Sequence, residues 1–178
     1  SVGKKRAYRI TIDAENRSEQ IPRETGILLV REGNNYISDG IYDGLIRTKC
    51  CKKAYLRGMF MGIGTMSDPE KSYHLEFVCR TETLSKDLRK LINSFVDLQA
   101  KESKRGKSYL VYVKKADYIG DILGIMGADT HSLIITTTQV EKSMRNKVNR
   151  MANCDNANLD RVVEAAMKQA AAVEKIER

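Results

Sequence analysis

The chain carries few side chains whose types and spacing suit catalysis. It has two histidines, His74 and His131, and no G-x-S-x-G, Walker A or strand-to-helix G-x-G-x-x-G motif. His74 precedes Glu76 by two residues, so one strand face could hold both as an acid/base pair. Such a pair is more often a surface hydrogen bond. These residues therefore predict neither a hydrolase nor a nucleotide site.

The residues that could bind a metal are poorly spaced for it. The cysteines are Cys50, Cys51, Cys79 and Cys154. They form no C-x-x-C pair, and two adjacent cysteines do not easily ligate one tetrahedral zinc. Asp68 and Glu70 could be displaced ligands of a hard cation, but a turn around Pro69 already explains them. We expect no metal and no cofactor.

The charge of the chain points to a polyanionic partner. Its 178 residues carry a formal net charge of +8. Residues 47–57 contain basic residues and no acid, and residues 99–115 contain Glu102 as their one acid. A solvated surface is the alternative for each run. The sequence lacks a long apolar run and an apolar signal core, so we expect a soluble, cytoplasmic protein with no membrane contact.

Residues 52–63 have the pattern of a helix that contains two glycines. Gly58 and Gly62 are four apart and lie on one helix face, although each costs about 1 kcal/mol relative to alanine. A stripe without side chains lets another backbone approach closely. Gly64 suits the helix end, where a left-handed conformation is easiest for glycine. We expect a helix-packing interface at Gly58 and Gly62.

This helix resembles the LAGLIDADG motif of homing endonucleases, in which two such helices pack in parallel and deliver acids to metal ions. The matching residues are Leu56, Gly58, Gly62 and Gly64. The acid positions of the motif fall on Met61 and Ile63, and neither side chain can hold a divalent cation. The resemblance implies the scaffold of a nuclease without its carboxylates, and hence no enzyme.

Two further segments, 68–76 and 145–158, are similar to the WhiA family of bacterial regulators, which is linked to sporulation and cell division. The resemblance implies a LAGLIDADG-like α+β domain over residues 1–128. Within it, residues 1–48 would be the tail of a first repeat and residues 49–128 the second repeat. Residues 129–178 would be a helical linker leading toward a helix-turn-helix domain absent from this chain.

Hydrophobic periodicity predicts the elements that must position these residues. We expect strands at 7–13, 72–80 and 107–114, helices at 19–31, 52–63, 83–101 and 115–126, and a loop at 33–44. A helix over 139–151 should break at 153–156, and a second helix over 157–178 should pack on it. The fold class is α+β, with an antiparallel sheet covered on one face by helices and a C-terminal helical extension.

The uncovered face of that sheet is the expected DNA surface, because by resemblance it forms a saddle in the major groove. Its residues would be Arg9, Thr11, His74, Glu76, Arg80, Ser108, Tyr112 and Lys114. The alternative is that these are ordinary solvent-exposed strand residues with no role in DNA binding, and we prefer this alternative for Glu76 and Ser108. The candidate DNA-binding residues are Arg9, Lys49, Lys52, Lys53, Arg80, Lys104, Arg105, Lys107, Tyr112, Lys114, Arg145, Lys147 and Arg150.

The sequence therefore favours a non-catalytic DNA-binding or docking domain of a transcriptional regulator. We expect DNA as its partner, and also consider a transcriptional protein partner and a homodimer formed through Gly58 and Gly62. Two alternatives stay open. One is an active metal-dependent endonuclease, and the other is a protein-interaction module that makes no DNA contact.

Overall fold

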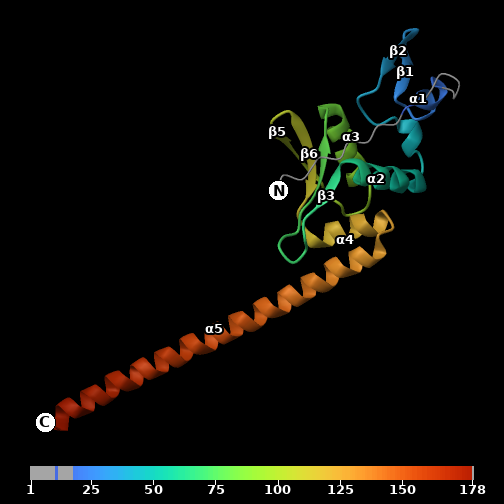
Figure 1. Cartoon of the computed structure of the whole chain (residues 1–178). Coiled ribbons are helices and arrows are strands. Elements are labelled where there is room, and N and C mark those ends of the chain that lie inside the picture. The colour runs from blue at the N-terminus through green and yellow to red at the C-terminus, as the bar shows by residue number, and fades with distance from the viewer. Residues whose placement is uncertain (1–10, 12–17, 178) are drawn as a thin grey trace.

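The computed structural model describes Thr11 and residues 18–177 of the chain. The expected strand at 7–13, with Arg9, lies outside these residues except for Thr11. The described part comprises an α+β body and a long helix that extends from it (Figure 1). No helix in this part is both long enough and apolar enough to cross a membrane.

The first elements form a small unit that differs from the prediction. The structure has α1 (Gln20–Glu24), β1 (Leu28–Arg31) and β2 (Asn34–Ile37), where we expected a helix over 19–31 and a loop over 33–44. β1 and β2 pair in an antiparallel hairpin.

Backbone conformation explains why the helix predicted over 19–31 and the loop predicted over 33–44 are wrong. Gly26 has φ +68°, which ends α1 before the apolar run of β1. Glu32 and Gly33 have φ of 53° and 81°, and two consecutive left-handed residues form the turn that suits a two-residue hairpin. The apolar residues before this turn therefore pair as a strand.

The glycine-containing helix is confirmed as α2 (Lys49–Ile63), which follows the short 3-10 helix η2 (Asp43–Ile46). It begins three residues earlier than predicted because the Thr48 hydroxyl accepts a hydrogen bond from the Cys51 amide at 3.1 Å. Gly64 ends the helix with φ −86° and leads directly into a strand, so the expected left-handed conformation is wrong.

The main sheet contains β3 (Gly64–Met66), β4 (Leu75–Cys79), β5 (Lys101–Arg105) and β6 (Ser108–Val113). Its order is β3-β4-β6-β5, and all neighbours are antiparallel. The strands expected at 72–80 and 107–114 are confirmed as β4 and β6. β3 and β5 were not predicted.

Helix α3 (Glu82–Asn93) is shorter than the predicted helix over 83–101. It starts after Thr81, whose hydroxyl accepts a hydrogen bond from the Leu84 amide at 3.3 Å. The chain turns at Asp97, which has φ 62°, and residues 101–105 then pair with β6. Helix α4 (Ala116–Ile125) confirms the helix predicted at 115–126.

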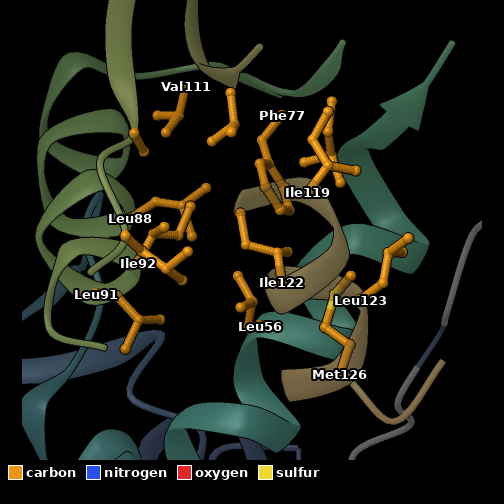
Figure 2. Packing of buried hydrophobic residues seen from close by; sticks show 14 of the residues in the cluster. Leu56, Phe77, Leu88, Leu91, Ile92, Val111, Ile119, Ile122, Leu123 and Met126 are labelled. Atoms are coloured by element: carbon orange, nitrogen blue, oxygen red, sulfur yellow. The ribbon is translucent and has the colours of Figure 1, made fainter. Parts of the chain in front are cut away.

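The core lies between one face of the sheet and helices α2, α3 and α4 (Figure 2). Leu56 of α2, Leu88 of α3 and Ile119 of α4 are fully buried. They belong to one cluster with Phe77 of β4 and Val111 of β6. The α+β class, with helices on one face of an antiparallel sheet, is confirmed.

The last helix, α5 (Asp129–Glu177), is continuous, so the predicted break at 153–156 is wrong. No glycine or proline follows Gly127, and asparagine or aspartate lowers helix propensity too little to stop a helix alone. The N-terminal part of α5 packs on α4, and Ser132 Oγ donates to the Gly120 carbonyl at 2.8 Å. The expected packing of residues 157–178 on the preceding helix is also wrong, because α5 is one extended rod (Figure 1).

Candidate nucleic-acid interface

The open face of the sheet is fixed by strand register. Glu76 lies opposite Tyr112, which in turn lies opposite Lys101, whereas Phe77 and Val111 face the helices. Alternation along the strands therefore assembles one surface, which we call the open face. Its polar residues are Thr65, His74, Glu76, Arg80, Lys101, Ser103, Arg105, Ser108, Tyr112 and Lys114.

The carboxylate on this face is already paired. Glu76 Oε2 lies 3.0 Å from His74 Nε2 and accepts from Arg105 Nη2 at 3.4 Å. The Glu76 side chain is 15% exposed and that of Arg105 is 68% exposed. The pairing with His74 matches the surface hydrogen bond considered for these two residues. The other carboxylate within the four strands of the main sheet, Glu102, is on the helix side and lies 3.3 Å from Arg89.

An aromatic residue lies among the cations of the open face. The Tyr112 ring is 5.9 Å from the His74 ring, and Lys114 Nζ is 5.3 Å from the Tyr112 centroid. Lys101, which lies opposite Tyr112, is exposed beside them, and Arg80 is exposed at the far end of the face, next to Ser108. A half-buried aromatic ring surrounded by exposed cations can contact both sugar and phosphate. Sequence reasoning did not place Lys101 here because β5 was not recognised.

Two candidate residues from the basic run over 99–115 lie elsewhere. Lys104 pairs with Tyr109 on the side covered by α3, and its Nζ is 5.5 Å from the Tyr109 ring centroid. Lys107 follows Gly106, which has φ +59°, in the turn between β5 and β6. Lys104 is therefore not part of the open face, and Lys107 borders it.

The basic residues of α2 form a separate group. Lys49, Lys52 and Lys53 are in the first turns of α2, and the far end of this helix enters the sheet at Gly64. A helix of 15 residues is about 22 Å long. Lys52 Nζ also donates to Ser94 Oγ at 3.1 Å. The two basic runs therefore do not merge into one surface.

The last residues of α2 occupy the positions at which the LAGLIDADG motif has its acidic residues. Met61 is 81% exposed, and Ile63 is half-buried against the core. Among the described residues, no group of histidine, cysteine and carboxylate side chains could hold a metal ion. Asp68 Oδ1 accepts from the Glu70 amide at 3.0 Å, the turn role proposed from the sequence. Gly58 and Gly62 are exposed, and a Cβ at either position would meet nothing within 4 Å.

A third basic group lies on α5, where Arg145, Lys147 and Arg150 are all exposed. The β3–β4 loop holds the helix beside them. Lys142 Nζ donates to the Pro69 carbonyl at 2.6 Å and lies 4.9 Å from the Tyr73 ring centroid, while Arg145 Nη2 is 3.7 Å from Glu70. The loop and helix enclose an open groove of about 640 Å³.

An antiparallel sheet with one helical face, entered by a helix with exposed glycines, defines a LAGLIDADG-like domain. The sequence profile of the WhiA LAGLIDADG-like domain matches residues 52–145, and that of the WhiA C-terminal HTH domain matches residues 148–178. The chain belongs to the WhiA family.

Curated relatives carry the same family name. The chain is 42% identical over 178 residues to "Probable cell division protein WhiA" of Clostridium perfringens strain 13, covering 100% of the chain and 56% of that protein. It is 43% identical over 170 residues to the protein of the same name from Alkaliphilus metalliredigens, covering 96% and 53%. The chain thus spans about half the length of these relatives.

The crystal structure of full-length DUF199/WhiA from Thermatoga maritima is similar in fold, with a TM-score of 0.56 and 24% sequence identity. The match covers 75% of this chain and 50% of that one. The HTH match corrects one expectation, because residues 148–178 fall within the profile of the family's C-terminal domain rather than ahead of it.

Proposed function

We propose that this chain is the DNA-binding, non-cleaving part of a WhiA-type transcriptional regulator that acts in cell division or sporulation. The observation that carries the proposal is the charge of the open face. Exposed Lys101 and Lys114 lie beside Tyr112, exposed Arg80 follows β4 at the other end of the same face, and Glu76 is paired with Arg105. Such a face attracts phosphates and releases their counterions.

The HTH profile match at residues 148–178 supports DNA as the polyanion. The names of the curated relatives support a role in cell division. We also propose transcriptional control, a role in sporulation and association with the nucleoid, and these three rest on the family resemblance.

The absence of nuclease activity is proposed from the side chains at the end of α2. Two-metal phosphodiester cleavage needs carboxylates held beside the scissile phosphate. Met61 and Ile63 occupy the motif's acid positions, and Ile63 packs against the core. Neither side chain offers the oxygen ligands that magnesium requires.

A docking role is the second candidate, and it rests on a different observation. Gly58 and Gly62 leave a strip of α2 backbone uncovered by any part of the described chain within 4 Å of their Cβ positions. A second helix can approach such a strip closely. A transcriptional protein partner or a second copy of the chain would contact it, independently of the open face.

A salt titration tests the DNA-binding proposal. Binding of a fluorescein-labelled 30-base-pair duplex is measured from 50 to 300 mM salt. Each phosphate contact contributes about 0.9 to the slope of log affinity against log salt, so Lys101→Ala with Lys114→Ala should flatten it by roughly 1.8.

Two double variants complete the experiment. Lys86→Ala with Lys90→Ala removes the same charge from α3 and should leave the slope unchanged. Lys52→Ala with Lys53→Ala tests the α2 group separately. Equal slopes for the wild type and the Lys101/Lys114 variant would show that the open face makes no phosphate contact.

A further inference from the structure

The groove between α5 and the β3–β4 loop has an unusual lining. Its residues are Tyr73, Gln139, Lys142, Ser143, Asn146, Asn149, Arg150 and Asn153. Positions 142, 146, 149 and 153 recur at three- and four-residue intervals and so lie along one helix face. We call this the amide face. Val140, Met144, Val148 and Met151 lie on the opposite side of the helix.

The amide face is free of negative charge over a defined length. No acid occurs between Glu141 and Asp155, and this interval contains four cations. Asp160 and Glu164 continue the same face seven and eleven residues after Asn153. The electropositive part of the face therefore ends after about four turns of the helix.

The asparagines have no role in folding that the structure reveals. Asparagine is among the less favourable helix formers, yet Asn146, Asn149 and Asn153 occur in the middle of α5. Within the described chain, none of their side-chain amides donates or accepts a hydrogen bond to protein. All three residues are exposed. Their amides are available to an external partner.

The adjacent contacts fix the direction in which this face points. Lys142 binds the Pro69 carbonyl and Arg145 lies beside Glu70, so the β3–β4 loop anchors α5 just before the asparagines. Every described side chain from Ser143 onward is exposed. The helix thus projects from the body with its whole circumference accessible (Figure 1).

We infer that residues 139–153 of α5 enter the major groove of duplex DNA and read adenine through Asn146, Asn149 and Asn153. This inference rests on the proposed DNA-binding function and adds base recognition to it. A helix 10–12 Å in diameter fits a groove about 12 Å wide. An asparagine amide matches the adjacent N6 donor and N7 acceptor of adenine, and Arg145 and Arg150 flank the face where the phosphates would run.

The test uses the full chain and a pool of 40-base-pair duplexes with a randomised 12-base-pair centre. After selection, the affinity of the enriched duplex is compared with that of a scrambled duplex at one salt concentration. The wild type should enrich adenine-containing sites. Loss of one bidentate amide contact in Asn149→Ala or Asn153→Ala should lower the selectivity ratio by about 5- to 150-fold.

Two controls separate base reading from folding and from charge. Asn158→Ala removes an amide on the other side of the same helix and should leave selectivity unchanged. Replacing adenine by 7-deazaadenine removes the N7 acceptor, so it should weaken the wild type and have no effect on the variant that lacks the matching asparagine. Far-ultraviolet circular dichroism should be at least as helical in each alanine variant, because alanine favours a helix.

The outcomes distinguish this inference from the proposed function. If the wild type binds duplex DNA in a salt-dependent manner but enriches no sequence, or if the asparagine variants keep the wild-type selectivity, the inference is overturned and phosphate binding stands. If the wild type binds no duplex even at 50 mM salt, the proposed function itself fails.

Discussion

Replacing both glycines of α2 by alanine should stabilise the isolated chain. A Cβ built at Gly58 or Gly62 meets nothing within 4 Å, so neither substitution creates a steric clash. Glycine in a helix interior is about 0.8 to 1.0 kcal/mol less favourable than alanine. Gly58 is in the helix interior and Gly62 in the last turn of α2, so the double variant Gly58→Ala/Gly62→Ala should gain roughly 1 to 2 kcal/mol in free energy of unfolding. For a chain of this length, that gain corresponds to an increase in Tm of about 2 to 8 °C.

Urea unfolding followed by tyrosine fluorescence measures the effect, since the chain has eight tyrosines and no tryptophan. Gly127→Ala is the control. Gly127 has φ +79°, and a Cβ there would lie 3.0 Å from the Arg57 guanidinium, so this variant should lose about 1 kcal/mol.

Protein concentration separates two roles of the glycine stripe. A gain in stability at low concentration, with a lower mass in solution at high concentration, would indicate that the stripe joins two copies of the chain. A loss of 1 kcal/mol or more in dilute protein would refute the reasoning, because it would mean that α2 is already covered within one chain.

Two further predictions concern the body of the fold. Burial raises the pKa of the Cys79 thiol from 9.0 to about 11. Because the unfolded chain loses this proton at a lower pH than the folded chain, the free energy of unfolding should fall as pH rises from about 9 to about 11. Urea titrations across this range should show that Cys79→Ala removes this contribution. The Thr81 hydroxyl caps α3 and donates to the Asp39 carbonyl at 2.9 Å. Thr81→Ala should therefore lower the free energy of unfolding, measured in urea, by about 1 kcal/mol, and Thr81→Ser should keep most of the wild-type value.

Elements with strong periodicity were predictable from the sequence, and those created by pairing were not. Leu75, Phe77 and Cys79 alternate with polar residues, so β4 was recognised. In contrast, β5 reads Lys-Glu-Ser-Lys-Arg and is exposed throughout, because it is an edge strand that exists through its pairing with β6. The break predicted at 153–156 failed because capping residues can also continue a helix when no glycine or proline stops it.

The sequence was enough to predict which basic residues the candidate interface contains, but not which face of the sheet each of them lies on. The basic residues are visible in the sequence, yet the turn at Gly106 sets the register that directs Lys104 toward the helices and Lys101 toward the open face. The resemblance at Gly58 and Gly62 indicated a LAGLIDADG-like helix, and segments 68–76 and 145–158 indicated the WhiA family. The anchoring of α5 by Pro69 and Glu70 needed a three-dimensional structure.

The central claim is that this LAGLIDADG-like scaffold binds DNA and does not cut it. Supercoiled plasmid should be incubated with pure protein at 50 mM salt with magnesium or manganese, and one half of each sample analysed for retardation and the other, after deproteinisation, for strand breaks. The account predicts retarded plasmid that stays fully supercoiled after deproteinisation. Metal-dependent nicking that is abolished by Asp68→Ala, or plasmid that migrates unretarded at every protein concentration, would contradict it.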